Sequence, residues 1–409
     1  MSTHSNLLAI VEAGLKSVDG EVCVGHALNQ ANTGQGGVGI VAIGKSSVAM
    51  AEGALAYFGS RIVSGLVIAK ELTNDVVLPS IIQCHIGGHP IPDQRSLDAG
   101  ELLIGYLEKL PLDIELVFLI SGGASALVEV LADDVSLDQL QSLNRWLLTS
   151  SLDITHMNAL RQCVSRIKAG RLAKVIRASQ VSSLLMSDVP ANDTAIIGSG
   201  LLSASSPSVS FDGLPDEIRQ YCSNQPPRPA LNDKKITSIR QKIVADINVA
   251  LSAMVLTAEA LSYAVHRHDK VMNGDVNDWV DYVVSYLDGA PKGLHFWGGE
   301  TTIELPKLSG KVGCGGRNTH MALELAVRLA GIEDVTVVCV ATDGDDGCSG
   351  YAGAIINGKT LSDKGITLDL ARHSLNAADS ATLLKQASAL LTYPKGRSNV
   401  ADIFLLLKS

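Results

Sequence analysis

Two basic side chains lie in glycine-flanked loops, one in each half of the chain. Lys45 follows an aliphatic run at residues 38–43, Arg317 follows Gly315-Gly316, and both precede stretches with helical periodicity. A helix N-terminus favours an anion because it presents free backbone N–H groups and the positive end of a dipole. A lysine or arginine in that place can neutralise phosphoryl oxygens. A plain turn with a solvated cation is the alternative for each.

Two glycine patterns near Lys45 resemble nucleotide-binding motifs. Residues 39–46 match the P-loop pattern G-x-x-x-x-G-K-[ST], but residues 40–43 are Ile, Val, Ala and Ile, which are typical of a strand interior. We therefore reject a true P-loop and retain only a lysine at a strand end. Residues 34–39 fit the dinucleotide pattern G-x-G-x-x-G, yet they precede the strand instead of following it. This order disfavours a nicotinamide-dependent dehydrogenase.

A second loop, at residues 121–125, has paired glycines flanked by serines after another apolar run. Glycine lets a backbone approach a ligand closely, and the hydroxyl groups suit phosphate or substrate oxygens. In the basic segment at residues 158–171, a helix would place Asn158 and Arg161 on one face. A tight turn and a solvated helix face are the alternatives. The candidate substrate- or phosphate-binding residues here are Ser121, Gly122, Gly123, Ser125, Asn158, Arg161 and Lys168.

Three carboxylates also follow apolar runs or paired glycines. Asp188 comes after residues 181–186, Glu300 after Gly298-Gly299, and Asp343 after residues 335–340. Carboxylate oxygens near a phosphate site suit Mg²⁺, which commonly binds one or two carboxylates together with substrate phosphates. Loops rich in Asp and Gly also form ordinary turns. The sequence thus offers Asp188, Glu300 and Asp343 as candidate metal ligands.

The apolar runs themselves predict the fold class. They are short, rich in β-branched residues and without alternation, which is typical of strands buried on both faces of a parallel sheet. Helical periodicity often follows them, so we predict a doubly wound α/β fold whose ligands bind at the carboxyl ends of the strands. The Ser- and Pro-rich stretch at residues 203–235 interrupts this pattern. We interpret it as a junction between domains at residues 1–225 and 226–409.

Composition limits the class of protein further. The 409 residues are 46% hydrophobic and 18% charged, with a net charge of -9 and no concentrated basic patch, so nucleic acid is not an expected partner. The 7 cysteines are scattered without zinc spacing, as in reduced cytosolic proteins. We find neither a signal-peptide pattern nor an apolar run long enough to cross a membrane. We expect a cytoplasmic protein without membrane contact, and a homo-oligomer is compatible with the sequence.

Taken in order, these segments resemble the glycerate 2-kinase family, whose C-terminal half is known as the MOFRL domain, here about residues 290–405. Single motifs are weak, but their joint order covers most of the chain. The matching segments are residues 42–45, 88–93, 120–123, 165–173, 187–190, 298–302, 315–318, 342–344 and 396–402. The chain departs from the family at Ala124, at Arg397 and at residues 348–351, where P-T-D-A is usual.

The resemblance implies two α/β domains, a Rossmann-like N-terminal one and a smaller C-terminal one, with the active site in the cleft between them. It implies ATP and Mg²⁺ as cofactors, and phosphorylation of D-glycerate at its 2-hydroxyl to give 2-phosphoglycerate and ADP. Lys45 and Arg317 map to residues thought to act in phosphoryl transfer, and Asn318 and Asn399 join the candidate binding residues. Two alternatives stay open: a hydroxypyruvate reductase-type oxidoreductase, and a non-catalytic protein that binds small hydroxy acids on the same scaffold.

Overall fold

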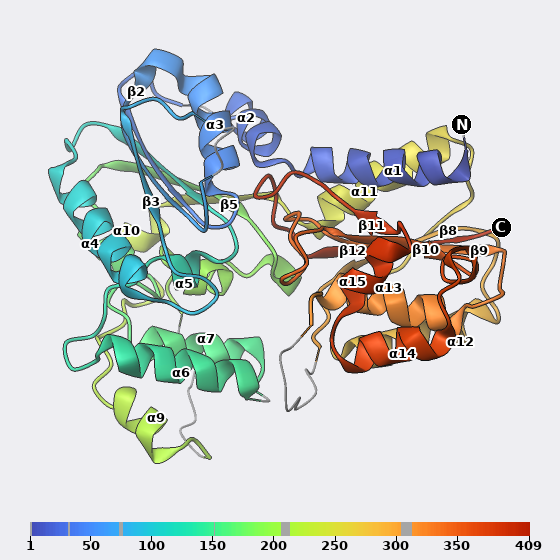
Figure 1. Ribbon diagram of the computed structural model, residues 1–409. Coiled ribbons are helices and arrows are strands. Elements are labelled where there is room, and N and C mark those ends of the chain that lie inside the picture. Colours follow the sequence, from blue (N-terminus) through green and yellow to red (C-terminus); the bar gives the residue numbers. More distant parts are fainter. Residues whose placement is uncertain (1, 32, 73–76, 151, 206–212, 304–312) are drawn as a thin grey trace. The chain divides into compact units, whose positions relative to one another are not determined.

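The computed structural model describes all residues except 1, 32, 73–76, 151, 206–212 and 304–312. It divides into two compact units (Figure 1). We call Asp19–Ala245 the parallel-sheet unit, and Met1–Val18 together with Asp246–Ser409 the mixed-sheet unit. The division differs from the predicted boundary at residue 225, because residues 240–245 add a last strand to the first sheet and the N-terminal helix packs in the second unit.

The parallel-sheet unit has a six-stranded sheet in the order β3-β2-β1-β4-β5-β6, and every neighbouring pair is parallel. This is the strand order of the Rossmann fold, and it confirms the predicted doubly wound parallel sheet. The order reverses between β1 and β4, which are adjacent in the sheet. The strands are β1 (Val38–Ile43), β2 (Ile62–Ala69), β3 (Ile82–Ile86), β4 (Glu115–Ile120), β5 (Gln180–Met186) and β6 (Arg240–Ala245).

Helices cover both faces of this sheet (Figure 1). On one face lie α2 (Gly20–Asn29) and α3 (Ser47–Phe58). The opposite face is covered by α4 (Gln94–Lys109), α5 (Ala124–Leu127), α8 (Arg171–Val175) and α10 (Lys234–Thr237). A smaller helical layer has its own apolar cluster and consists of α6 (Leu137–Thr149), α7 (Ile154–Cys163) and α9 (Asp216–Tyr221). Short 3₁₀ turns are η1 (Gly59–Arg61), η2 (Pro190–Asn192) and η3 (Ile197–Ser199).

The expected domain junction at residues 203–235 lies inside the parallel-sheet unit. Its described part carries α9 and then leads through α10 into β6. Residues 206–212 of this stretch lie outside the described residues. Its low hydrophobic periodicity reflects a surface connection between helices, because only a few side chains of the segment, such as Ile218 and Tyr221, reach an apolar cluster.

The mixed-sheet unit is a second six-stranded sheet, in the order β11-β10-β9-β12-β8-β7. Only β7 and β8 pair in parallel, and the other pairs are antiparallel. Its strands are β7 (Val265–Arg267), β8 (Gly293–Gly299), β9 (Val335–Ala341), β10 (Gly353–Asn357), β11 (Leu390–Leu391) and β12 (Asp402–Lys408). The apolar runs at residues 294–297 and 335–340 are therefore strands, as predicted, but in a sheet of mixed direction.

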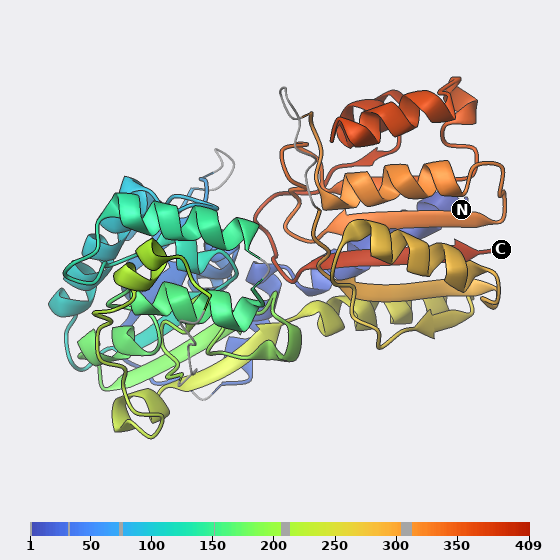
Figure 2. The same ribbon diagram turned by 90° about the horizontal axis from the view of Figure 1, so that it is seen from below.

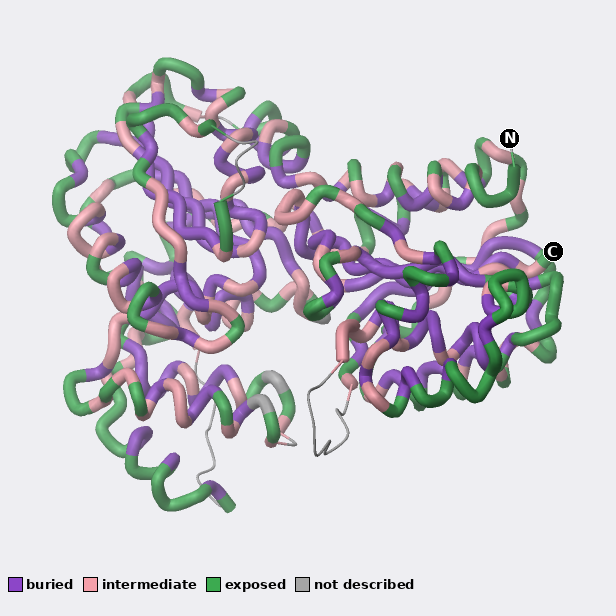
Figure 3. Tube along the Cα trace, viewed as in Figure 1, coloured by how far each residue is buried: buried purple, intermediate pink, exposed green. Residues whose placement is uncertain are grey.

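The mixed sheet is also covered on both faces (Figures 1 and 2). On one face lie α1 (Thr3–Ser17) and α11 (Ile247–Ala260). The other face carries α12 (Val276–Leu287), α13 (Arg317–Arg328), α14 (Leu368–Asn376) and α15 (Ser380–Gln386), with the 3₁₀ turn η4 (Ser362–Lys364). In both units the buried residues concentrate on the strands (Figure 3). No helix in the described ranges is long and apolar enough to span a membrane.

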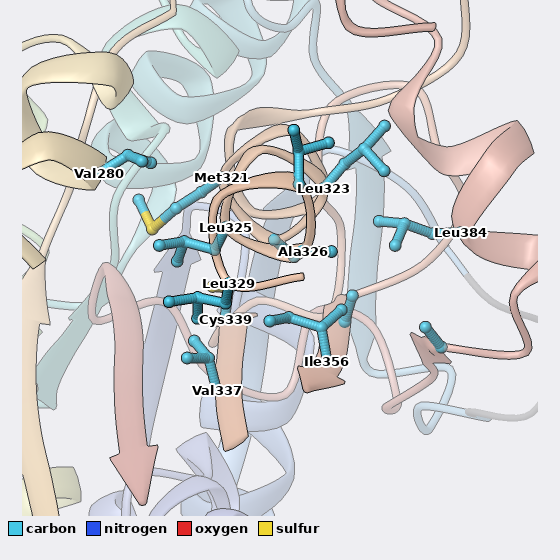
Figure 4. Close-up of a cluster of buried hydrophobic side chains, with 14 of the residues drawn as sticks. Val280, Met321, Leu323, Leu325, Ala326, Leu329, Val337, Cys339, Ile356 and Leu384 are labelled. Carbon is cyan, nitrogen blue, oxygen red and sulfur yellow. The ribbon is translucent and has the colours of Figure 1, made fainter. Parts of the chain in front are cut away.

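Helix α13 is the central helix of the second core. Its Met321 and Leu325 recur at helical spacing and pack with Val337, Cys339 and Ile356 of the sheet (Figure 4). All five are at most 1% exposed. Full burial of a side chain of this size stabilises a fold by about 1.5–3 kcal/mol. This packing fixes the axis of α13, and thereby the position of its first residue, Arg317.

Candidate functional site

Two loops meet at the carboxyl ends of β1 and β4, where the strand order of the parallel sheet reverses. The Lys45 N–H donates to the carbonyl of Gly122 (2.9 Å), and the Ser121 N–H donates to that of Ile43 (3.0 Å). The Ser121 hydroxyl accepts from the Ser46 N–H (3.0 Å). These bonds join the loops at the point where doubly wound sheets bind ligands. Ser121 is wholly buried, so it holds the loops together instead of facing a ligand.

Glycine is required in both loops. Gly44 has φ 133°, and a Cβ there would lie 2.1 Å from the Ser121 Oγ. Gly123 has φ 83°, and a Cβ there would lie 3.1 Å from Lys45 Cγ and 3.3 Å from the His89 ring. A side chain at either position would strain the backbone, and at Gly44 it would also collide with Ser121. The glycine at position 123 therefore lets Lys45 and His89 lie close to one stretch of backbone.

A cavity of about 240 Å³ opens beside this backbone within the parallel-sheet unit. It brings together six of the predicted residues, namely Gly122, Gly123, Ser125, Asn158, Arg161 and Asp188. Residues that the sequence did not single out complete its wall, among them His89, Asn144, Val189 and Ser199. The cavity thus combines backbone, hydroxyl, amide and charged groups in a volume suited to a small polar molecule.

Arg161 is the cation in this wall, and its electrostatic situation is unusual. Its Nε donates to the Oδ1 of Asn144 (3.2 Å), a neutral partner. Among the residues that the structure describes, no carboxylate lies within ion-pair distance of Arg161. Burial lowers the pKa of its guanidinium below the ordinary value. A partly buried cation without a carboxylate partner among the described residues is incompletely compensated, so this position is suited to an anionic ligand.

A chain of short hydrogen bonds fixes the polar groups next to Arg161. The Ser199 hydroxyl donates to Asn158 Oδ1 (2.8 Å) and contacts the Ser125 hydroxyl (2.7 Å). Ser199 adopts φ 56°, a left-handed conformation that is uncommon outside glycine. Backbone strain of this kind is retained where a side chain must point in a specific direction. Ser125 and Asn158 are therefore presented to the cavity in fixed orientations.

Lys168 is not brought to the cavity. It is 1% exposed and forms an ion pair with Glu129, whose other oxygen accepts from the Ser165 hydroxyl (2.6 Å). The sequence placed Lys168 on the basic helical segment, but α7 ends at Cys163. The chain then turns inward, so Lys168 leaves the face that carries Asn158 and Arg161. Burial raises the pKa of Glu129 and lowers that of Lys168, whereas their contact opposes both changes.

The mixed-sheet unit gathers a second polar cluster at one edge of its sheet. Asp402, at the start of β12, pairs in register with Gly299 of β8 and Ala341 of β9. Because β12 is antiparallel to both, its first residue lies beside their last ones. Glu300, Asp343 and Asp402 therefore share this edge, next to the N-terminus of α13.

Arg317 is held by two carboxylates of this cluster. Its guanidinium forms two hydrogen bonds with Asp402, one of them Nη2 to Oδ1 at 2.9 Å, and its Nη1 lies 2.6 Å from the Glu300 Oε1. Burial acts to lower the pKa of Arg317, but Asp402 and Glu300 outweigh it and raise the pKa above the ordinary value. Glu300, a predicted metal ligand, is thus engaged by Arg317.

Asp346 anchors the start of α13. Its carboxylate accepts from the N–H groups of Asn318 (2.9 Å) and Thr319 (2.8 Å), which are free donors of the first turn. Asn318 is 1% exposed, and its Oδ1 has no hydrogen-bond partner within the described part of the chain. Burial raises the pKa of Asp346, and the hydrogen bonds from the helix oppose that shift.

Asn399 and Asp343 lie in loops at this edge of the mixed sheet, Asn399 before β12 and Asp343 after β9. Asn399 is buried between Ser398 and Val400, which hydrogen-bond to the carbonyl and hydroxyl of Thr342 (2.6 and 2.9 Å). Asp343 is 9% exposed, and its Oδ1 accepts from the Asp345 N–H (3.1 Å). Across the described ranges, no group of three or more His, Cys, Asp or Glu side chains is arranged to hold a metal ion.

The sequence reasoning missed several residues of both clusters. His89 could have been found, because it lies in a Gly-Gly-His-Pro loop directly after β3. Asp402 carries a weaker signal, an isolated carboxylate before the apolar run of β12. Ser199 and Asn144 carry none, since each is one polar residue among many and only the tertiary fold brings it to the cavity.

Comparison with known proteins agrees with this architecture. Two family models match the chain: "Domain of unknown function (DUF4147)" over residues 6–221 and "MOFRL family" over residues 293–402. A D-glycerate 2-kinase of Thermotoga maritima is 28% identical over 97% of this chain and 96% of its own length. A putative hydroxypyruvate reductase of Agrobacterium vitis is 31% identical over 90% of this chain and 98% of its own length.

The solved structure of a glycerate kinase from Thermotoga maritima has the same fold, with a TM-score of 0.80, 24% identity and 99% coverage of both chains. The fold and the two matched models define the class: a two-domain α/β protein with a parallel-sheet unit followed by a MOFRL domain. The chain belongs to the glycerate 2-kinase family.

Proposed function

We propose that this chain is a kinase that transfers the γ-phosphoryl group of ATP to the 2-hydroxyl of D-glycerate, giving 2-phosphoglycerate and ADP. The observation that carries the proposal is Arg161, a partly buried guanidinium without a carboxylate partner among the described residues, in a cavity beside the Lys45 loop. That arrangement suits a small carboxylic acid next to a phosphate. Relatives named D-glycerate 2-kinase or glycerate 2-kinase that match over nearly the whole chain support the same substrate.

Within the cavity, Arg161 would bind the glycerate carboxylate, since a guanidinium pairs with both carboxylate oxygens. Asn158 and Ser125 are oriented to hydrogen-bond the hydroxyl groups. The backbone of Gly122 and Gly123 lines the cavity and would lie against phosphoryl oxygens. The hydroxyls of Ser46 and Ser47, at the start of α3, are buried and have no partner within the described residues, so they are further donors near Lys45.

In the reaction, the 2-hydroxyl oxygen forms a bond to the γ-phosphorus while the bond to the β–γ bridging oxygen breaks, and the hydroxyl proton is released. Such transfers depend on positioning and on neutralising charge on the phosphoryl oxygens. Lys45 supplies one positive charge. We assign Arg317 to the same step, where Asp402 and Glu300 fix the direction of its guanidinium.

Mg²⁺ is part of the proposal because ATP carries several phosphate charges that a cation must balance. Asp188 fits as its protein ligand: it follows β5 and lines the cavity with Gly122 and Gly123. Glu300 fits less well, because its carboxylate already pairs with Arg317. Asp188→Asn should therefore raise the Mg²⁺ concentration for half-maximal rate by ~10-fold, whereas Glu300→Gln should not. The reverse pattern would move the metal to the mixed-sheet unit.

We also propose a cytoplasmic location and no role for nucleic acid or membranes. All 7 cysteines are free thiols, as expected in a reducing compartment. A homo-oligomer is compatible with this proposal, and sedimentation of the purified protein would measure it.

An oxidoreductase acting on hydroxypyruvate is the second candidate, because two relatives from Agrobacterium vitis are named putative hydroxypyruvate reductases. The position of the glycines speaks against it. The G-x-G-x-x-G match at residues 34–39 lies before β1 and ends on its first two residues, whereas a dinucleotide phosphate binds in the turn after that strand. Incubation with NADH or NADPH and hydroxypyruvate, followed at 340 nm, separates the two candidates.

The test of the proposed function is incubation with ATP, Mg²⁺ and a panel of three- and four-carbon hydroxy acids, with identification of the phosphorylated products. D-glycerate should give a product that enolase consumes without a mutase. A signal that needs added mutase would mean that the 3-phosphate is formed. Absence of any ATP-dependent product, with acid binding retained, would favour the non-catalytic binding protein.

A further inference from the structure

Two cysteines lie in the loops that position Arg317. Cys314 stands three residues before Arg317, and Cys348 stands two residues after Asp346, the carboxylate that anchors the start of α13. Cys348 is exposed and Cys314 is half-buried. Neither has a role in the proposed transfer.

Each thiol lies against the backbone that carries or flanks the other cysteine, and the two thiols are close enough to interact. The Cys348 Sγ lies 3.5 Å from the N–H of Gly315 and 3.7 Å from the carbonyl of Gly313, so it touches the backbone on both sides of Cys314. The Cys314 Sγ in turn lies 3.3 Å from the carbonyl of Cys348. The Cys348 N–H also donates to the Gly315 carbonyl (3.2 Å). A disulfide needs Cα atoms ~4.4–6.8 Å apart, a separation that these contacts permit.

Accessibility distinguishes this pair from the other cysteines. Cys163 and Cys222 also contact one another, but both are at most 1% exposed and lie inside the α6–α7 layer. Cys23 and Cys339 are buried singly, and Cys84 has no cysteine near it among the contacts of the described residues. A reagent from solvent can therefore reach Cys348 and pass the oxidation directly to Cys314.

We propose that Cys314 and Cys348 form a redox modification site that controls the position of Arg317. In thiol–disulfide exchange with a low-molecular-weight disulfide, one thiolate first forms a mixed disulfide and releases one thiol. The second thiolate then displaces the second thiol. Two protein thiols are oxidised to one disulfide, and one reagent disulfide is reduced to two thiols. The more exposed Cys348 reacts first, because burial and the Cys348 thiol both raise the pKa of Cys314.

The cross-link affects Arg317 because the intervening glycines have no free space. A Cβ on Gly315 would lie 2.4 Å from the Ser380 Oγ, and one on Gly316 would lie 2.4 Å from the backbone of Asp346. Drawing Cys314 toward Cys348 must therefore shift these residues and the start of α13. A misplacement of ~1 Å in a catalytic group can lower a rate by ~10²-fold, so we expect kcat to fall at least ~10-fold. This consequence rests on the proposed role of Arg317.

The experiment treats the full-length protein with oxidised glutathione, alkylates remaining thiols and maps the peptides by mass spectrometry. We expect a linked pair of peptides containing Cys314 and Cys348, a fall in kcat with ATP and D-glycerate, and recovery of both with dithiothreitol. Cys348→Ser and Cys314→Ser should each abolish the link and the sensitivity. Cys84→Ser, which removes a partly exposed thiol of the other unit, should retain both.

The outcomes separate this inference from the proposed function. If the reduced protein phosphorylates glycerate but both thiols are still alkylated after oxidation, the modification site is refuted and the kinase proposal stands. A linked protein with unchanged kcat refutes control of Arg317. A link that forms in a protein without kinase activity leaves the disulfide established and refutes the proposed function.

Discussion

Two partly buried arginines, one in each unit, have opposite kinds of partner. In the parallel-sheet unit, Arg161 lines a cavity and donates to the neutral side chain of Asn144. In the mixed-sheet unit, Arg317 binds Asp402 and Glu300. Burial lowers the pKa of the first guanidinium, whereas adjacent carboxylates raise the pKa of the second. Arg161 is therefore the arginine of this contrast whose guanidinium is left for an external anion.

The difference assigns separate tasks to the two cations. The positive charge of Arg161 has no carboxylate partner among the described residues until an acid binds, so Arg161 should govern substrate affinity. Arg317 is already neutralised and fixed in direction, so it should contribute little to affinity and more to the orientation of charge in the transition state. We expect Lys45, like Arg317, to act mainly in the transition state. Its side chain lies beside the glycine loop and not beside Arg161. The following predictions test that division.

The largest expected effect is on kcat. Lys45→Ala and Arg317→Ala should each lower kcat by ~10³-fold, by analogy with arginines that stabilise the transferring phosphoryl group. If the two act in one step, the double variant should lose far less than the product of the single losses. Steady-state rates with varied ATP and D-glycerate give both values. Arg328→Ala is the matched control, since Arg328 ends the same helix and pairs with Asp281 at the surface. Full activity of Lys45→Ala would refute the mechanism.

A smaller effect is expected at Arg161, and on a different constant. A hydrogen-bonded pair with a charged group is worth about 1.5–3 kcal/mol, so Arg161→Met should raise KM for the acid by ~10- to ~10²-fold. The free energy of unfolding should stay equal or rise, because an uncompensated charge is removed. Arg166→Met is the control, since Arg166 lies on the surface beside Asp133. A fall in kcat with unchanged KM would reverse the roles given to Arg161 and Arg317.

Lys168 provides a third test, in which stability changes and affinity does not. Lys168→Met leaves Glu129 buried without its partner, and breaking such a pair costs about 3–5 kcal/mol. Urea unfolding should show this loss, and KM of the folded fraction should remain unchanged. The double variant Lys168→Met/Glu129→Leu should recover part of the stability, because no buried charge is left. A raised KM without a loss of stability would restore Lys168 as a binding residue.

Much of this arrangement was predictable from residues 38–47 and 116–125. Uninterrupted aliphatic runs identified β1 and β4, and the polar residues after them identified the edge where ligands bind. Lys45, Gly122 and Gly123 followed from that rule alone, because the ends of parallel strands meet at one edge of a sheet. The direction of the second sheet was not predictable in the same way, since buried antiparallel strands show the same apolar runs.

The failures concern side chains whose role depends on tertiary contacts. Lys168 and Arg161 lie seven positions apart on a basic segment. Because α7 ends between them at Cys163, Arg161 lines the cavity whereas Lys168 turns inward. Glu300 has the sequence context of a metal ligand, and only the register of β12 reveals Asp402 and the paired Arg317 beside it. Charge and loop position thus identify candidates, whereas pairing between distant segments decides what each one binds.

The smallest expected effect concerns acid stability, and it also distinguishes the units. The described histidines whose pKa values are lowered by burial, His268, His295 and His320, all belong to the mixed-sheet unit. For His295, burial on β8 lowers the pKa from 6.5 to about 4. It stacks on His266 with ring centroids 4.6 Å apart, and its Nδ1 lies 2.9 Å from the Tyr286 hydroxyl.

Because the folded pKa is lowered, the unfolded chain binds a proton at His295 before the folded chain does. The stability of the mixed-sheet unit should therefore be fully present above pH ~6.5 and decline as the pH falls toward 4. Urea unfolding at pH 7 and pH 5, followed by tryptophan fluorescence in a Trp146→Phe background, reports on this unit, since Trp279 and Trp297 both lie in it. His295→Phe should flatten the dependence, and His373→Gln, at an exposed site on α14, should not. Equal urea midpoints at pH 7 and pH 5 in the protein with His295 intact would mean that this histidine binds its proton equally well in the folded and unfolded states. The expected acid sensitivity of the mixed-sheet unit would then be refuted.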